Sequence, residues 1–181
     1  MHVERRDGWW RATEVALSFD DQVGAVLLYG SFGRGDADEW SDIDIIVFIS
    51  DDRLAEVVAD RTRFGERFGT AVYVLDSTWN APVTGARVNV LYRLDTGLPL
   101  YVDWNLWPLS MAKQPLDTKV VFERSPGLIA PVATTFERWA TYERQPRPSW
   151  PSGGRELPPP RAIRYGPDRG EVLRPASTTT P

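Results

Sequence analysis

Two aspartates, Asp42 and Asp44, are the residues in this chain whose spacing most directly indicates chemistry. They lie in the segment SDIDIIVFIS, whose β-branched composition predicts a strand. Because alternate residues of a strand point to the same face, both carboxylates share one face, while Ile43 and Ile45 anchor the other. Two carboxylates on one face repel each other unless a cation lies between them. Their hard oxygen atoms suit Mg²⁺, which takes the rest of its ligands from water and phosphates.

A glycine-rich segment precedes the two aspartates and predicts a phosphate site. The apolar run 25–29 predicts a strand that ends at Gly30, and Ser31 stands where a short helix could begin. Backbone N–H groups at such a turn, together with the Ser31 hydroxyl, can bind phosphate oxygens. The glycines that follow permit close approach of the backbone, and Arg34 offers a planar donor. A phosphate cradle beside a pair of acids is what phosphoryl or nucleotidyl transfer requires.

The order of these residues resembles the nucleotidyltransferase superfamily typified by DNA polymerase beta. Its small bacterial members, the aminoglycoside nucleotidyltransferases and the minimal nucleotidyltransferases, are the most similar. The resemblance covers roughly residues 10–110 and is carried by Gly30, Ser31, Gly35, Ser41, Asp42 and Asp44. It implies a third carboxylate on a neighbouring strand. Asp103, in the segment LPLYVDWNL, has a suitable position, since it alternates there with Tyr101 and Asn105.

The resemblance also implies the reaction and the roles of the site residues. The residues it assigns to catalysis and to metal binding are Asp42, Asp44 and Asp103, and those it assigns to the nucleotide are Gly30, Ser31 and Arg34. The expected activity is Mg²⁺-dependent transfer of AMP, or another nucleoside monophosphate, from a nucleoside triphosphate, with ATP as the expected donor. The acceptor is a hydroxyl group of a small molecule, an aminoglycoside antibiotic being one example, and pyrophosphate is released. Such an acceptor would connect the chain with antibiotic resistance.

Two alternatives to this activity remain open from the sequence. Antibiotic-modifying members of the superfamily carry a further helical domain that helps to bind the acceptor, whereas in this chain the predicted strands are followed by one candidate helix, at 128–144, and then a proline-rich segment. The chain could therefore be a minimal nucleotidyltransferase that modifies a protein partner, as in toxin–antitoxin pairs. It could also be a truncated, inactive nucleotide-binding protein.

Alternating strand and helix patterns predict the elements that must position these residues. Besides the two strands already named, strands are expected over residues 70–76, 87–94 and 99–106. Helices are expected over 9–19, 52–64 and 128–144; in the first, Ala12, Val15, Ala16 and Phe19 have the spacing of one buried face, and in the last Pro131 falls in the first turn. We therefore expect an α/β (α+β) domain, with a mixed sheet of about four to five strands flanked by helices in a nucleotidyltransferase-like fold.

The composition excludes several other kinds of chemistry and partner. The chain has 181 residues, no cysteine, and a single histidine at position 2, so Cys–His catalysis and Cys- or His-bound zinc are excluded. There is no P-loop motif. Residues 1–145 are net acidic, which argues against a nucleic-acid backbone as partner. No apolar run is long enough to span a membrane and no leader pattern is present, so a cytoplasmic protein is expected.

Residues 146–181 hold nine of the 15 prolines and are expected to be a disordered tail beyond a catalytic domain at 1–145.

A few aromatic and acidic residues carry weaker expectations. Trp40 could stack on a base, but an aromatic residue beside a strand start is more often packed, and packing is the prediction. The pair Trp9 and Trp10 is expected to dock the first helix on the core. The acids within residues 36–52 could form a rim that attracts a cationic acceptor. His2 is expected to be a disordered terminal residue.

Overall fold

A computed structural model describes residues 2–77, 81, 84–95 and 97–143 of the chain. The expected disordered tail at 146–181, and the domain boundary near residue 145, lie outside these residues and stay predictions. The elements follow one another in the order α1 (His2–Phe19), β1 (Val23–Tyr29), α2 (Gly30–Arg34), β2 (Ile43–Ile49), α3 (Asp51–Ala59), α4 (Arg61–Glu66), β3 (Ala71–Asp76), β4 (Ala86–Arg93), β5 (Pro99–Pro108), η2 (Leu109–Met111), β6 (Lys113–Gln114), β7 (Lys119–Glu123), β8 (Ala130–Pro131) and α5 (Phe136–Glu143).

The main sheet is mixed and has six strands in the order β3-β4-β5-β2-β1-β7. Its central pair, β2 and β5, is parallel, and the other neighbouring strands are antiparallel. The predicted fold class is therefore confirmed. The sixth strand is β7, which the sequence reading did not anticipate and which pairs with β1 at the edge of the sheet. The short strands β6 and β8 form a separate parallel pair.

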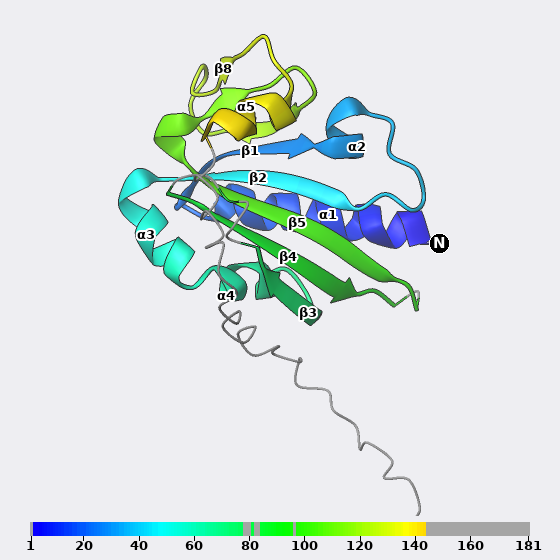
Figure 1. The fold of residues 1–181 in the computed structure, drawn as a ribbon. Helices are drawn as coiled ribbons and strands as arrows, with labels where there is room; N and C mark the ends of the chain where they lie inside the picture. Colours follow the sequence, from blue (N-terminus) through cyan, green and yellow to red (C-terminus); the bar gives the residue numbers. More distant parts are fainter. Residues whose placement is uncertain (1, 78–80, 82–83, 96, 144–181) are drawn as a thin grey trace, which may run out of the picture.

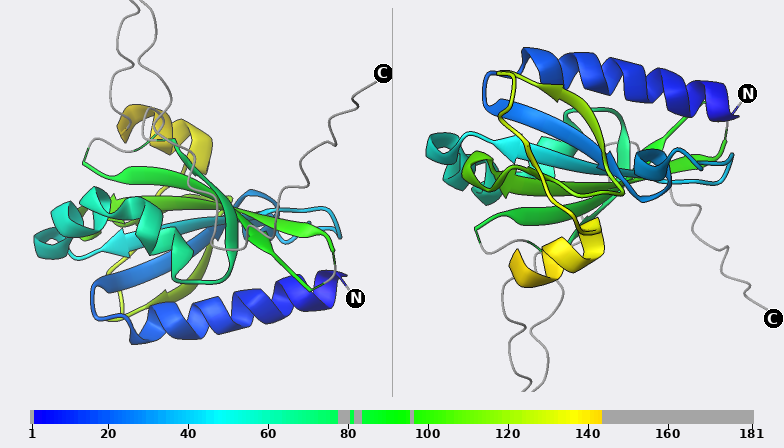
Figure 2. Two further views of the ribbon diagram at one scale, coloured as in Figure 1. Left: turned by 90° about the horizontal axis from the view of Figure 1, so that it is seen from below. Right: turned by 90° about the horizontal axis from the view of Figure 1, so that it is seen from above.

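Helices cover the sheet on both faces (Figures 1 and 2). One face packs against α1, α3 and α4 around a core that includes Leu17, Phe64 and Trp104. The other face packs against α5 around a second core that includes Phe48 and Trp107. Both cores exclude water from the middle of the sheet, so the central strands are held in one register.

Strand periodicity places the predicted acids on the α5 face of the sheet. Ile43 and Ile45 are fully buried in the core on the α1 face, as predicted, so Asp44 between them points to the opposite face. Further along that same face of β2 and β5 lie Phe48 and Trp107, which belong to the α5 core. One face of these two strands is thus acidic at one end and apolar at the other.

Helix α1 differs from the prediction in both its start and its buried face. It begins at His2, which is helical and not a disordered terminal residue. The four residues predicted to face the core, Ala12, Val15, Ala16 and Phe19, are all exposed. The buried positions are Arg6, Thr13 and Leu17 instead. The large side chains decide the orientation: Trp9 and Trp10 pack on the core, as predicted, and this turns the small apolar residues toward solvent.

Two other helix predictions are wrong in their extent. The helix predicted over 52–64 is two helices, α3 and α4, separated at Asp60. The helix predicted over 128–144 begins only at Phe136, because Ala130–Pro131 forms strand β8 beside β6. The N–H of Phe136 donates to the Asp117 carboxylate, which satisfies a free donor at the new helix start. Among the helices in the described part of the chain, none has the length and apolar character to cross a bilayer.

Candidate active site

The Gly-Ser turn lies directly against one of the two predicted metal-binding acids. β1 ends at Tyr29 and α2 starts at Gly30, so Ser31 stands in the first turn of a short helix, as predicted. Gly30 has φ +60, and a Cβ built there would lie 2.1 Å from the Asp44 Oδ2 atom. Glycine is required here both by the backbone conformation and by the carboxylate beside it. The structure therefore brings the predicted phosphate turn and Asp44 into contact.

The sheet register brings the three predicted acids together. Asp44 on β2 is the direct partner of Asp103 on the parallel strand β5, and Asp42 immediately precedes β2. Burial, followed by the negative charges of Asp42 and Asp103, raises the pKa of Asp44 to about 7. Burial also raises the pKa of Asp42, with a further contribution from the charge of Asp103. The charges of Asp42 and Asp103 both act on Asp44, because the three side chains lie close together.

Asp103 is the most enclosed of the three acids, with 2% of its surface exposed. The Arg87 guanidinium donates to both of its oxygen atoms, from Nε to Oδ1 at 2.9 Å and from Nη2 to Oδ2. The Tyr29 hydroxyl donates to Oδ2 at 3.0 Å, and the Asn105 amide donates to Oδ1 at 3.3 Å. Burial and the charges of Asp103 and Asp44 hold the pKa of Tyr29 well above its usual value, so this hydroxyl keeps its proton and remains a donor.

The sequence reading missed Tyr29 and Arg87 as members of the site. A signal for Arg87 was present, because polar residues alternate with valine in RVNVLYRL, and this places Arg87 and Asn89 on one face of β4. Asn89 is the register partner of Asp103, so that face is the acidic one. Tyr29 carried no comparable signal, since it ends an apolar run and resembles any other strand residue.

A buried arginine from α1 holds the loops that carry the site. Arg6 is 4% exposed and donates through Nη1 to the backbone oxygens of Asp38 and Ser41, the second at 3.3 Å. Its guanidinium lies 4.8 Å from the centre of the Phe32 ring on α2. Arg6 therefore connects the helix that follows the Gly-Ser turn with the loop that leads into Asp42. Nothing in the sequence pattern distinguished it from the other arginines of α1.

Two residues near the site, Trp40 and Arg34, are exposed, and only for Trp40 does this contradict the prediction. Trp40 is 74% exposed, so the prediction that it packs is wrong. Its loop is stabilised by polar contacts around Asp38 and Ser41, which leave the indole in solvent. Arg34 is half-exposed at the end of α2, and its Nε donates to Asp36 at 3.1 Å. Its predicted role in nucleotide binding stays a prediction.

The chemistry of the donor set fits a divalent cation at Asp42 and Asp44. Among the described residues, neither acid forms an ion pair with an arginine or lysine, and their mutual repulsion is relieved when a cation binds between them. Asp103 differs, because its oxygens already accept four hydrogen bonds from protein groups. Within residues 2–143 as described, no group of three or more acidic or histidine side chains is arranged to hold a metal ion.

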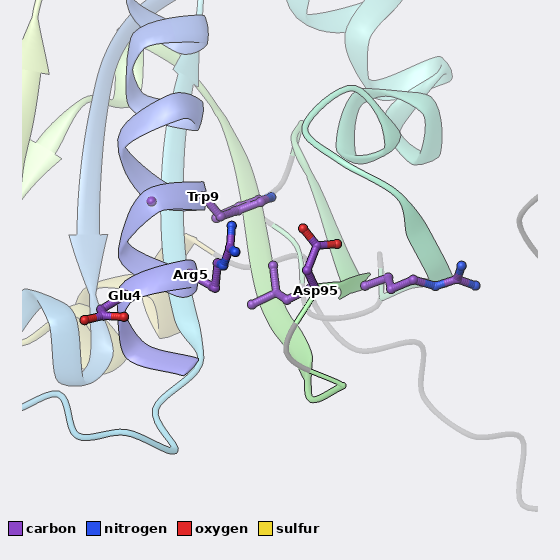
Figure 3. Close-up of a pocket in the computed structure, with 7 residues that line it drawn as sticks. Glu4, Arg5, Trp9 and Asp95 are labelled. Atoms are coloured by element: carbon purple, nitrogen blue, oxygen red, sulfur yellow. The ribbon is translucent and has the colours of Figure 1, made fainter. Parts of the chain in front are cut away.

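A pocket of about 290 Å³ lies apart from these residues, between the first half of α1 and the end of β4. Figure 3 shows Arg5 on α1 and Asp95, in the turn that follows β4, on either side of it, together with Trp9. The Trp9 indole N–H donates to the Phe68 carbonyl, and its ring packs on Tyr92 with centroids 4.9 Å apart. The position of Trp9 is therefore explained by its packing on the core. No predicted site residue lines this pocket.

A mixed sheet with a Gly-Ser turn against Asp44, and with Asp42 directly before the same strand, is the arrangement that the resemblance to nucleotidyltransferases implies. A family model described as a nucleotidyltransferase domain matches residues 12–124, which is more than half of the chain. The chain belongs to this nucleotidyltransferase domain family, and the resemblance stated from the sequence is confirmed. Members of such a family transfer a nucleoside monophosphate from a nucleoside triphosphate. The match contains every predicted site residue and excludes Arg6 and α5. No curated protein matches the chain.

Proposed function

We propose that this chain is a Mg²⁺-dependent nucleotidyltransferase that transfers AMP, or another nucleoside monophosphate, to a hydroxyl group of a small acceptor and releases pyrophosphate. The observation that carries this proposal is the contact between Gly30 and Asp44. A Cβ at Gly30 would meet the Asp44 carboxylate at 2.1 Å, so the turn that would bind phosphate and the acid that would bind its metal ion are adjacent. Nucleotidyl transfer needs both groups at one point.

The roles of the individual side chains follow from their surroundings. Asp42 and Asp44 would hold the Mg²⁺ ion, and Ser31 with the backbone of the Gly-Ser turn would bind the triphosphate. When bound, Mg²⁺ would neutralise charge on the triphosphate and lower the pKa of the acceptor hydroxyl. Asp103 is the third carboxylate of the proposed catalytic set. Tyr29 keeps its proton beside Asp44 and Asp103 and can donate to an oxygen atom in the site.

The charge near the site favours a cationic acceptor, such as an aminoglycoside. Three exposed acids, Asp36, Asp38 and Glu39, lie on the loop that leads into Asp42. Their negative potential would attract a polycation to the entrance of the site. Because exposed charges are screened by salt, the KM for a cationic acceptor should rise with ionic strength. A KM that does not change with salt would argue for a neutral acceptor.

Labelled nucleotides test the reaction. The protein is incubated with Mg²⁺, an acceptor panel that includes aminoglycosides, and nucleoside triphosphates labelled at the α- or the γ-phosphate. We expect the α label on the acceptor and the γ label in pyrophosphate. Asp42→Asn and Asp44→Asn should each lower the rate by more than about 100-fold, because a metal ion contributes several kcal/mol to such a transition state.

The same experiment separates the alternatives. Glu56→Gln, which alters an exposed acid on α3, is the matched control and should retain the wild-type rate. Transfer of the γ label would identify a phosphotransferase instead. Label on a co-purified protein and on no small molecule would support modification of a protein partner. Wild-type transfer in Asp44→Asn would contradict the metal assignment.

A further inference from the structure

The hydrogen bonds of Asp103 leave little capacity for a metal ion. A carboxylate has about four lone-pair positions. The four donors from Arg87, Tyr29 and Asn105 match that number, and the side chain is 2% exposed. A divalent ion could bind Asp103 only by displacing at least one of these donors. Arg87 is the hardest to displace, because its planar guanidinium contacts both oxygen atoms at once.

Arg87 also supplies positive charge at this place. It is always protonated, and its charge lies against the buried side of the acidic site. A second divalent ion between Asp44 and Asp103 would be repelled by this fixed cation, at short range and with little solvent to screen it. Two-metal sites hold their ions about 3.5–4 Å apart between shared carboxylates, and such an arrangement needs Asp103 to be free on that side.

The opposite half of the site has no such internal cation. Asp42 is exposed and Asp44 is partly buried, and within the described part of the chain neither pairs with an arginine or lysine. Arg87 acts mainly on Asp103, because its guanidinium donates to both oxygen atoms of that carboxylate and, among the described residues, forms no ion pair with Asp44. The negative charge of the site that has no ion-pair partner is therefore concentrated on Asp42 and Asp44.

We propose that Arg87 is a built-in counter-cation for Asp103, so that the site takes a single divalent ion, on Asp42 and Asp44 alone. Asp103 is then a positioning residue that orients Arg87 and Tyr29, and it does not bind the metal. This inference deepens the proposed function, because it defines how that same site holds its ion. It also changes the role that the resemblance implied for Asp103 from metal ligand to anchor.

The number of bound ions tests this directly and needs no nucleotide or acceptor. Mn²⁺ is titrated into the full-length protein and the free ion is counted by electron paramagnetic resonance. The wild type should bind one Mn²⁺, Asp44→Asn should bind none, and Asp103→Asn should still bind one, with a weaker Kd because the unpaired Arg87 charge remains beside the site. Arg87→Met removes the charged guanidinium but keeps an unbranched side chain similar to the aliphatic part of arginine, and it should bind two, because Asp103 is released.

Two further variants guard against misfolding as an explanation. Arg61 pairs with Asp76 away from the site, so Arg61→Met removes a comparable Arg–Asp pair and should still bind one Mn²⁺. The double variant Arg87→Met with Asp103→Asn leaves neither charge unpaired and should return the count to one.

Three results would overturn the inference: two ions in the wild type with one lost in Asp103→Asn, one ion in Arg87→Met, or no ion in the wild type. Failure of nucleotide transfer with a count of one would instead contradict only the proposed reaction.

Discussion

The acidic site has two halves that are built from the same sheet but satisfied in opposite ways. In the half formed by β4 and β5, Asp103 is enclosed and bound by Arg87, Tyr29 and Asn105. In the half formed by α2 and β2, Asp42 and Asp44 have no internal cation among the described residues, and the pKa of Asp44 is raised to about 7 by burial and by its acidic neighbours. Asp44 and Asp103 are nevertheless direct register partners.

This difference separates an acid whose charge is paired inside the protein from acids whose charge is not. A buried charge must be paired inside the protein or be paired by something that binds. Asp103 meets the first condition, so substituting it alone leaves the Arg87 charge unpaired. Asp44 forms no ion pair among the described residues, so its charged form lowers the stability of the free protein. The two halves should therefore respond in opposite directions to the same substitution.

The largest expected effect is on stability. Asp103→Asn leaves Arg87 without its carboxylate in a largely buried place, and should lower the free energy of unfolding by about 3 kcal/mol. Asp44→Asn removes a disfavoured charge, and should raise the free energy of unfolding of the metal-free protein at pH 8. Urea unfolding in EDTA measures both.

Glu56→Gln is the control for that pair of variants, since it removes an exposed Arg–Glu pair on α3 and should change stability by no more than about 0.5 kcal/mol. Equal destabilisation by Asp44→Asn and Asp103→Asn would contradict the view that Asp103 is paired inside the protein and Asp44 is not.

A smaller effect is expected from substitutions in the Gly-Ser turn. Both Gly30 and Gly35 have positive φ, so alanine at either costs about 1–2 kcal/mol of stability from the backbone alone. The two differ in what the new Cβ meets: the Asp44 carboxylate at Gly30, and nothing within 4 Å at Gly35. Gly30→Ala should therefore also displace Asp44 and reduce transfer by about 100-fold, and Gly35→Ala by less than tenfold. Equal loss of transfer in both variants would mean that backbone strain, and not the displacement of Asp44, is responsible.

Measured per pH unit, the smallest expected effect on stability is a pH dependence that arises from Asp44. Its pKa is raised in the folded protein, so the unfolded chain releases the proton first as pH rises. The stabilising contribution is complete below about pH 4 and is lost as pH approaches about 7, with a slope of at most about 1.4 kcal/mol per pH unit. Denaturation in EDTA across this range should show the decline, and Asp44→Asn should flatten it. Saturating Mg²⁺ should do the same, and a slope that neither change affects would assign it to other groups.

The half of the site formed by α2 and β2 was predictable from the sequence, for physical reasons. A glycine followed by serine after a buried strand, and two aspartates separated by one isoleucine, are short-range patterns that strand periodicity converts into a shared face. The face of β2 on which Asp44 lies follows from that periodicity, and the place of Ser31 follows from the end of the apolar run before it. Five of the six strands of the main sheet were also readable, because their apolar runs are bounded by turns.

In the half formed by β4 and β5, Asp103 was predicted but its partner Arg87 was not, because their contact depends on long-range register. Arg87 meets Asp103 only because β4 and β5 pair antiparallel, and no local pattern states which residue faces which. The same holds for Arg6, whose contacts are more than 30 residues away along the chain. The orientation of α1 was misjudged for a related reason: its bulky tryptophans, and not the regular spacing of its small apolar residues, determine the buried face.

The most direct test of the central claim, that Asp42 and Asp44 take up a metal ion that carries the nucleotide, is equilibrium binding of nucleoside triphosphates with and without Mg²⁺. The wild type should bind at least one of the four ribonucleotides in Mg²⁺, ATP being the first candidate. The affinity should fall more than tenfold in EDTA and in Asp44→Asn, and it should be unchanged in Arg61→Met, which alters a pair away from the site. Equal affinity in Mg²⁺ and EDTA, or wild-type affinity in Asp44→Asn, would contradict the claim.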